Sequence, residues 1–347
     1  MMMLNVDLLK RRARILAGIR AFFDSRGFVE VETPVRIVAP APEVNIDCPE
    51  VPPSRIHGGE TSYLRASPEL QMKKLLAAGM DRIYQIGPCF RDGEKGSRHN
   101  PEFTMIEWYR KDATYLDILE DTKRLYSFLS EICGDRPFVD GRGDRPFMDG
   151  RGDRPYVDGC GDRPFVGGCG DRPFVDDRGD RPFVEKGEFY GDNLVFKEIT
   201  VRDAYLSWAG WDPWTDWNQD RFDFDMATKI EPALKSLGLV FLMDYPPQAA
   251  SLAQIRGDVA ERWEFYSDGI ELANCFTELC DPVEQRRRFL DSKEERKQLG
   301  ESDYPIDEEF LAVLGGMKSA AGVALGVDRL VMKLVSADEI THVRCVD

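Results

Sequence analysis

Hydrophobic positions near the beginning of the chain recur at the spacing of a helix. Within residues 5–26 the positions that repeat turn by turn along one helix face are Leu8, Leu9, Ile15, Leu16, Ile19, Phe22 and Phe23. Gly27 follows, where helices often end in a left-handed glycine. Residues 28–32 then alternate apolar and acidic side chains, and Pro34 closes the run. The pattern predicts a helix followed by a strand.

Two further helix starts are predicted by capping residues followed by proline. Residues 67–69 read Ser-Pro-Glu, with an N-cap serine and proline at the first helical position, which predicts a helix over 68–78 that ends at Gly79. Residues 281–284 read Asp-Pro-Val-Glu, which predicts a second helix opened by a capping box.

The remaining clear pattern belongs to strands. Runs at 83–90 and 103–109 flank a polar, glycine-containing loop at 92–100, which predicts an antiparallel hairpin with a long loop. Residues 322–332 predict a glycine-bearing apolar strand that passes into a helix. Because strands and helices mix without regular βαβ alternation, we expect an α+β fold built on an antiparallel sheet.

A tandem repeat interrupts these patterns. Residues 134–187 contain six copies of a nine-residue unit that begins Gly-Asp-Arg-Pro. A proline in every copy removes a strand hydrogen bond, and the unit lacks the calcium-binding nonapeptide motif, so we predict a flexible surface insert. The Arg-Gly-Asp tripeptides within it arise at repeat junctions. Without the insert about 293 residues remain, which predicts a single domain over 1–347 with this one interruption.

Composition narrows the function classes. The 347 residues include 46 Lys+Arg and 62 Asp+Glu, for a formal charge of −16, which argues against binding nucleic acid through many phosphate contacts. No apolar run approaches the length that spans a bilayer, and the beginning does not resemble a signal peptide, so we expect a cytoplasmic protein without membrane contact. The eight cysteines form no CxxC pair and the three histidines are scattered, which argues against a zinc site.

The densest chemistry lies in residues 90–110. In the second predicted strand, a period of two places Phe103, Met105, Glu107 and Tyr109 on one face. A carboxylate beside a phenol on a mostly apolar face is costly unless a cation binds there. The alternative is that this face is solvated.

A second acidic cluster occupies residues 271–278. Strict strand alternation puts Asn274 and Glu278 on one face and Glu271 on the other, so either a bulge intervenes or the segment turns helical near Glu278. Paired carboxylates together with scattered arginines fit a site for magnesium and a triphosphate. The chain has no Walker A motif and no GxGxxG before a helix, so nucleotide binding is of another kind.

Three segments resemble the class II aminoacyl-tRNA synthetases. FRDGEKGSRHNPEFTMIEWYR is similar to motif 2, GVALGVDRL to motif 3, and GFVEVETP to motif 1. The nearest resemblance is to the lysyl-tRNA synthetase group, and within it to the truncated elongation factor P lysine ligases. The resemblance implies a sheet flanked by helices and a homodimer formed through the motif 1 region. The motif 1 helix begins within the first ten residues, so we expect no anticodon-binding domain and no tRNA substrate.

The resemblance also implies a nucleotide site for ATP and Mg²⁺. Arg91 would bind the α-phosphate and the substrate carboxylate, Arg329 the γ-phosphate, and Phe103 would stack on adenine; the two arginines are the expected catalytic residues. Motif 2 often reads Arg-Asn-Glu, but here the glutamate comes one place later, in Arg91-Asp92-Gly93-Glu94. The residue that contacts adenine could therefore be Asp92 or Glu94. The remaining implied ATP contacts are Asp92, Glu94, His99, Asn100, Glu271, Leu272 and Gly326, and the implied metal ligands are Glu271 and Glu278.

For the amino acid, the resemblance implies a pocket for lysine or (R)-β-lysine. Glu69 would receive the amino group near the reacting carboxyl, Tyr109 and Glu278 the side-chain ammonium, and Asn274 the carboxylate. Lysyl-tRNA synthetases usually have glycine where this chain has Ala324, and in the ligases an alanine accompanies a preference for β-lysine. The full implied pocket is Ser67, Pro68, Glu69, Tyr109, Asn274, Glu278 and Ala324.

The implied reaction is ATP-dependent activation of the amino acid as an adenylate, followed by transfer to a lysine side chain of elongation factor P. Two alternatives stay open from the sequence. The same adenylate chemistry could serve another acceptor, such as tRNA or a different protein, or the chain could be a non-catalytic regulatory paralogue.

Overall fold

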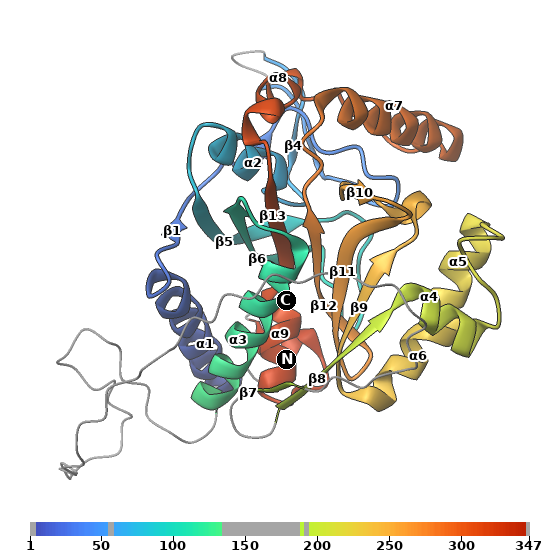
Figure 1. Cartoon of the computed structure of the whole chain (residues 1–347). Helices are drawn as coiled ribbons and strands as arrows, with labels where there is room; N and C mark the ends of the chain where they lie inside the picture. The colour runs from blue at the N-terminus through green and yellow to red at the C-terminus, as the bar shows by residue number, and fades with distance from the viewer. Residues whose placement is uncertain (1–4, 55–58, 134–187, 191–193, 345–347) are drawn as a thin grey trace, which may run out of the picture.

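A mixed ten-stranded sheet lies at the centre of the fold (Figure 1). The computed structural model describes residues 5–54, 59–133, 188–190 and 194–344. The flexible insert expected at 134–187 therefore lies outside the described residues.

Strand order in this sheet is β1-β5-β6-β13-β12-β11-β9-β8-β7, with β10 paired to β11, and β2-β4-β3 form a separate small sheet. The pairs β1–β5 and β8–β9 are parallel and the other pairs are antiparallel. Strands from before and after the repeat thus share one sheet. The strands are β1 Val29–Glu30, β2 Arg36–Ile37, β3 Glu50–Val51, β4 Ser62–Leu64, β5 Arg82–Phe90, β6 Glu102–Lys111, β7 Glu188–Tyr190, β8 Leu194–Thr200, β9 Leu239–Tyr245, β10 Ile255–Arg256, β11 Val259–Ser267, β12 Ile270–Thr277 and β13 Ala320–Gly326.

Helices cover both faces of this mainly antiparallel sheet, and the antiparallel pairing confirms the α+β class. Trp108 of β6 packs in the core under α1, α3 and α9, whereas the next residue, Tyr109, packs in the core of α2 and α8, so the two groups lie on opposite faces. Helices α4 to α6 pack beside β9 and β11 (Figure 1). The α-helices are α1 Val6–Asp24, α2 Glu69–Ala77, α3 Tyr115–Cys133, α4 Val201–Ala204, α5 Gln219–Asp225, α6 Glu231–Leu234, α7 Pro282–Leu299, α8 Glu308–Leu314 and α9 Val327–Leu334.

The strongest sequence patterns form the expected elements. Helix α1 buries its apolar stripe, including Ile19 and Phe23, and ends before Gly27, whose φ of +72° is the left-handed conformation that glycine adopts without strain. Strands β5 and β6 form the expected antiparallel hairpin, with Ile83 opposite Tyr109 and Cys89 opposite Phe103.

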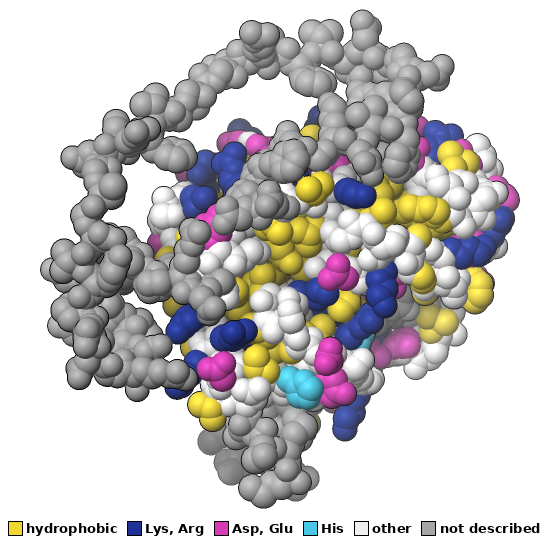
Figure 2. Space-filling view, turned by 90° about the horizontal axis from the view of Figure 1, so that it is seen from below, with side chains coloured by type: hydrophobic (Ala, Val, Ile, Leu, Met, Phe, Trp, Pro, Cys, Tyr) yellow, Lys and Arg dark blue, Asp and Glu magenta, His cyan; other side chains and the backbone are white. Residues whose placement is uncertain are grey.

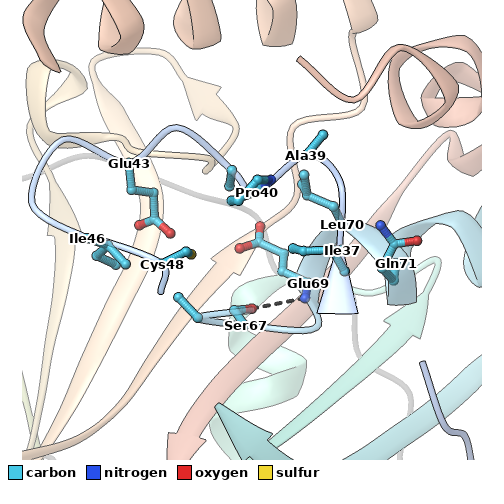
Figure 3. A pocket seen from close by; sticks show the side chains of 12 residues that line it. Ile37, Ala39, Pro40, Glu43, Ile46, Cys48, Ser67, Glu69, Leu70 and Gln71 are labelled. Atoms are coloured by element: carbon cyan, nitrogen blue, oxygen red, sulfur yellow. Dashed lines mark hydrogen bonds between the residues drawn. The ribbon is translucent and has the colours of Figure 1, made fainter. Parts of the chain in front are cut away.

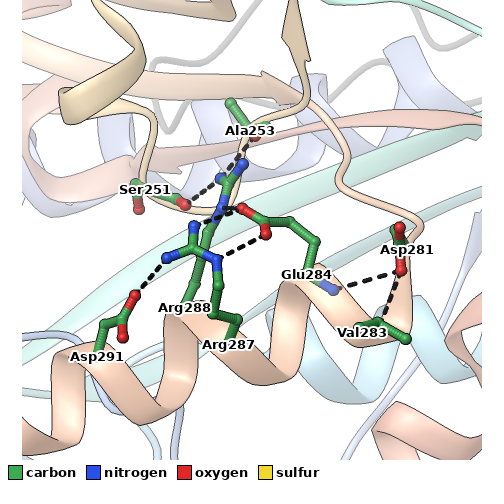
Figure 4. A network of polar contacts seen from close by, with 8 residues as sticks. All are labelled: Ser251, Ala253, Asp281, Val283, Glu284, Arg287, Arg288 and Asp291. Carbon is green, nitrogen blue, oxygen red and sulfur yellow. Dashed lines mark hydrogen bonds and ion pairs between the residues drawn. The ribbon is translucent and has the colours of Figure 1, made fainter.

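Helix α7 begins as expected, but with half of the predicted capping box. The Asp281 carboxylate accepts the backbone N–H of Glu284 at 3.3 Å. The Glu284 carboxylate does not reach back to the cap; it accepts from Arg287 and Arg288 instead (Figure 4). Arg288 also donates to the backbone carbonyl of Ser251 at 2.7 Å, which ties α7 to the loop after β9. The Glu284 carboxylate therefore binds the two arginine side chains rather than the backbone N–H of Asp281.

A bulge in β12 decides which way its polar side chains face. Phe265 of β11 is opposite Ala273 and Tyr266 is opposite Glu271, so Leu272 is an extra residue in the ladder. The extra residue restores Glu271 to the face of Asn274. Of the two alternatives left open by the sequence, the bulge is correct, and β12 runs as a strand through Thr277.

Candidate active site

Three neighbouring strands bring the predicted amino-acid residues together. Strand β13 lies between β12 and β6, and Ala324 is directly opposite Asn274 on one side and Glu107 on the other. Two residues earlier on β13, Gly322 is opposite Tyr109. Because a strand alternates faces with a period of two, these rows share one face. Residues distant in sequence therefore form a single surface.

Glu107 lies at the centre of this surface. Its side chain is fully buried and accepts hydrogen bonds from the Ser67 hydroxyl at 2.6 Å and the Tyr109 hydroxyl at 2.7 Å. The Ser67 oxygen also accepts the backbone N–H of Glu69 at 2.9 Å, next to Pro68 at the start of α2. Helix α2 thus begins in the pocket, one residue later than the predicted first helical position.

A lysine side chain occupies the same pocket. The Lys73 ammonium, from α2, lies 2.5 Å from the Glu278 carboxylate and also contacts Glu69. Lys73 and Glu278 are each 1% exposed. The sequence analysis did not select Lys73, although it stands four residues after Glu69, where a helix places two side chains on one face.

Burial and mutual repulsion raise the pKa values of the carboxyl groups here. The pKa of Glu107 rises to about 7, first through burial and then through the charge of Glu69. Burial likewise raises the pKa of Glu278, against the effect of Lys73. Burial alone would lower the pKa of Lys73, but Glu278 and Glu69 outweigh it and raise that pKa. Three carboxylates therefore share one ion-paired cation, Lys73, and the charge of buried Arg65 acts on Glu107 as well. The carboxyl groups whose pKa values stay raised can accept further positive charge.

Gly322 makes room for this arrangement. A Cβ atom at this position would lie 2.1 Å from the ring of Tyr109 and 2.8 Å from a carboxylate oxygen of Glu278. No other side chain fits here without displacing both groups. Gly322 belongs to the segment that resembles motif 3, but the sequence alone did not show that it makes room for Tyr109 and Glu278.

Arg91, one of the residues predicted for the nucleotide, has a donor without a partner among the described residues. Its guanidinium lies 5.2 Å from the centre of the Phe103 ring and 3.5 Å from the Glu94 carboxylate. Its buried Nε has no hydrogen-bond partner among the described residues. Buried donors rarely remain unpaired, so this atom points to a ligand that supplies an acceptor oxygen.

Arg329 gathers a second group of predicted nucleotide residues. It donates to the backbone carbonyl of Glu271 at 2.9 Å, lies 3.6 Å from the Glu271 carboxylate, and its Nη2 lies 2.6 Å from Nε2 of His99. Burial and the nearby Arg329 charge lower the pKa of His99, which favours the neutral imidazole. Asn100 donates to the Glu102 carbonyl at 2.7 Å and so shapes the loop before Phe103.

The two predicted metal ligands do not lie together. Glu271 is near the beginning of β12 and Glu278 follows its end, about 20 Å away at the rise of a strand. A single ion cannot bridge them. The carboxylate that does act on Glu271 is Glu264 of β11, which after burial is the main cause of its raised pKa. The sequence analysis missed Glu264, although the β11–β12 hairpin places it opposite Asn274 and on the same face of the sheet as Glu271.

Glu264 and Glu271 fit a Mg²⁺ ion that shares its ligands with phosphate. Magnesium is commonly held by one or two carboxylates together with substrate oxygens and water. Glu264 is fixed by hydrogen bonds from Arg262 and from the hydroxyl of Tyr266, each at 2.6 Å. Across the described residues, no cluster of three or more His, Cys, Asp or Glu side chains forms a metal site.

Arg262 links this carboxylate pair to the amino-acid surface. Its Nε donates to the amide oxygen of Asn274 at 3.2 Å while its Nη2 bonds Glu264. Two other predicted residues lie apart from these contacts: the Asp92 side chain is exposed, and Leu272 is buried in the core. Gly326 immediately precedes α9, and Arg329 follows three residues later in the first turn of that helix.

Charged side chains of both signs lie on the face of the molecule shown in Figure 2. In Figure 2, basic and acidic side chains are interspersed around hydrophobic ones, and the visible described part of that face has no continuous basic stripe. None of the helices in the described ranges is both long and apolar enough to cross a bilayer. The cysteines within those ranges, Cys48, Cys89, Cys133, Cys275 and Cys280, are free thiols.

The chain is similar to a known family and to several proteins that share one name. The chain matches the family of class II tRNA synthetases (D, K and N) over residues 5–345. The elongation factor P--(R)-beta-lysine ligase of Histophilus somni (strain 2336) is 33% identical, over 98% of this chain and 94% of the relative. The proteins of that name from Proteus mirabilis and Photorhabdus laumondii are 34% and 35% identical, over 98% and 96% of this chain and 94% and 93% of the relatives.

Proposed function

The chain belongs to the class II tRNA synthetase family (D, K and N), and on that basis we propose that it is an ATP-dependent ligase that activates (R)-β-lysine or lysine and transfers it to a lysine of elongation factor P. The names of its relatives support this acceptor and this amino acid. The strongest support from the site itself is the charge balance of the amino-acid pocket.

That pocket suits a substrate with two ammonium groups. Within the described residues, Lys73 is the cation that forms ion pairs with this group of acids, so Glu69, Glu107 and Glu278 exceed it by two negative charges when all three are ionised. Lysine and β-lysine each carry two ammonium groups, and a buried ammonium requires such partners. The substrate carboxylate then extends toward the nucleotide end, where Arg91 has a free donor.

In the first step, a carboxylate oxygen of the amino acid attacks the α-phosphate of ATP, and pyrophosphate leaves. Arg91 would neutralise charge that develops on the α-phosphate, and Arg329 would hold the γ-phosphate beside His99. Phe103 would stack on the adenine. Mg²⁺, held by Glu264 and Glu271 with the phosphates, would supply charge neutralisation. The contribution of the protein is mainly positioning, so no nucleophilic side chain is needed.

In the second step, the acceptor amine attacks the carbonyl carbon of the adenylate and AMP leaves. Ala324 lies between Glu107 and Asn274 and would shape the pocket beside the reacting end of the amino acid. One methyl group there can provide about 1–3 kcal/mol of discrimination. We therefore propose that Ala324 favours β-lysine over lysine.

The proposal extends to a homodimer formed through residues 27–34, the segment that resembles motif 1. Light scattering of the purified chain at several concentrations tests this part separately. A mass of one chain at all concentrations would remove the dimer from the proposal and leave the chemistry unaffected.

Two assays test the activity. The first is ATP–pyrophosphate exchange that depends on (R)-β-lysine or lysine. The second is the intact mass of elongation factor P after incubation with the protein, ATP, Mg²⁺ and one isomer. We expect exchange with both isomers, stronger with β-lysine, and a mass gain of one lysyl unit. Exchange without a mass gain would contradict the acceptor, and no exchange would contradict the activity.

A further inference from the structure

A pocket beside the amino-acid site contains a carboxylate that the proposed reaction does not use. It lies between residues 37–48 and the start of α2, and Glu43 and Glu69 point into it from opposite sides (Figure 3). Ser67, which bonds Glu107, also lines it, so this pocket adjoins the amino-acid surface. Its walls are mainly apolar and include Ile37, Ala39, Pro40 and Ile46.

The backbone around Glu43 is firmly held while its carboxylate is free. Arg296 of α7 is 1% exposed and donates to the backbone carbonyl of Glu43 at 2.7 Å and to that of Ile46 at 3.0 Å. Arg296 also pairs with the Asp47 carboxylate at 2.6 Å. The Glu43 carboxylate has no hydrogen bond or ion pair within the described parts of the chain. A fixed backbone that presents an unpaired acid is the arrangement expected of a binding residue.

Glu43 is an acid that neither Lys73 nor the proposed substrate neutralises. Lys73 and the two ammonium groups of the proposed substrate offset Glu69, Glu107 and Glu278. Glu43 is a fourth acid, and burial followed by the charge of Glu69 raises its pKa. One more cation is therefore favoured at this end of the site. The second reaction step brings one: the ammonium group of the acceptor lysine, on a chain of four methylene groups that suits apolar walls.

We propose that the acceptor lysine enters through this pocket and that Glu43 binds its ammonium group. This inference rests on the proposed function. The ammonium gives one proton to the Glu43 carboxylate and becomes an amine. The amine nitrogen then attacks the carbonyl carbon of the adenylate, the C–N bond forms, and the bond from that carbon to the phosphate oxygen breaks. AMP leaves with the electron pair, and the second nitrogen proton goes to water.

The test separates the two half-reactions in Glu43→Gln. We expect amino-acid-dependent ATP–pyrophosphate exchange within about twofold of wild type, because the adenylate forms without the acceptor, whereas transfer to elongation factor P falls at least tenfold. Glu43→Asp, which keeps the charge, should recover part of the transfer. Glu50→Gln is the matched control, because Glu50 is an exposed acid that follows the same segment, and it should change neither half-reaction.

Each other outcome overturns the inference. Transfer at the wild-type rate in Glu43→Gln would show that the ammonium does not need this acid. A raised KM for the amino acid in the exchange assay would assign Glu43 to the amino-acid pocket instead. If Glu43→Gln fails to fold, Glu43→Ser, which also removes the charge, takes its place, and normal exchange with normal transfer in that variant contradicts the proposal. Failure of the proposed function is distinguishable, because then wild type itself shows no exchange or no transfer.

Discussion

The ammonium of Lys73 lies 2.5 Å from the carboxylate of Glu278, and neither side chain reaches solvent. The contact joins the first turns of α2 to the end of β12. It also sets the charge of the amino-acid pocket, because Lys73 is the resident cation among three acids. Substrate binding therefore adds to an ion pair that already exists.

Replacing Lys73 with methionine should strongly destabilise the fold. The substitution keeps most of the apolar stem but leaves Glu278 buried without a cation, which costs about 3–5 kcal/mol. Urea unfolding measures the change. Lys74→Met is the control on the same helix, since Lys74 pairs with Asp307 at 2.8 Å and is 21% exposed; we expect at most about 1 kcal/mol there. Equal losses in both variants would contradict a special role for Lys73.

Amino-acid binding should strengthen as the pH rises through about 7. Glu107 has a pKa near 7, so below that pH it is protonated and cannot attract an ammonium group. The KM for the amino acid in the exchange assay should therefore fall between about pH 6 and 8. Glu107→Gln should raise KM and remove this inflection. An inflection near 7 that persists in the variant would assign it to another group.

In the substrate-free protein, the contribution of Glu107 to the free energy of unfolding should decrease as the pH rises, whereas amino-acid binding strengthens. Its folded pKa of about 7 lies above the ordinary value of 4.5, so the folded state binds the proton more tightly than the unfolded state. This contribution to the free energy of unfolding is present below pH 4.5 and is lost as the pH rises toward 7. The difference in unfolding free energy between wild type and Glu107→Gln, followed against pH, isolates it.

Gly322→Ala should impair both stability and amino-acid binding. The added methyl would lie 2.1 Å from the Tyr109 ring, so the ring must move, at a cost of about 1–3 kcal/mol. Thermal unfolding and the KM for the amino acid report the two effects. Gly315→Ala is the control, because a Cβ there meets nothing within 4 Å and its φ of −61° suits alanine. An unchanged KM in Gly322→Ala would place Tyr109 outside the pocket.

Arg91→Ala should remove adenylate formation without unfolding the chain. The arginine is half-buried and its free Nε is the candidate phosphate donor, so we expect exchange to fall about 10²- to 10³-fold. Circular dichroism should remain that of wild type. Arg14→Ala removes an exposed arginine on α1 and should leave exchange unchanged. Exchange near the wild-type rate in Arg91→Ala would contradict the assignment.

Local signals predicted the elements that hold the site. The hairpin of β5 and β6, the start of α2 shortly after Ser67 and the strand-to-helix passage into α9 follow from apolar periodicity and capping residues, which act over a few positions. The resemblance to synthetase motifs then indicated Arg91 and Arg329, each of which lies among other candidate nucleotide residues in the fold.

The residues that the sequence analysis missed depend on strand pairing. Glu107 was noted on the correct face, but its hydrogen bond from Ser67 joins β6 to the residue before α2. Glu264 meets Glu271 only through the register of β11 and β12, which the bulge at Leu272 shifts by one. Lys73 forms its buried ion pair with Glu278, which lies about 200 residues later in the chain. Such contacts are set by tertiary packing, which periodicity does not encode.

The place of β13 in the sheet has a consequence for synthesis of the protein. This central strand of the pocket begins at Ala320, more than half the chain after its neighbour β6 ends at Lys111. A nascent chain on the ribosome can form the β5–β6 hairpin early, yet the strand that pairs with Glu107 and Tyr109 is absent until β13 has been translated. Prematurely terminated products that stop before β13 should therefore be inactive in both half-reactions.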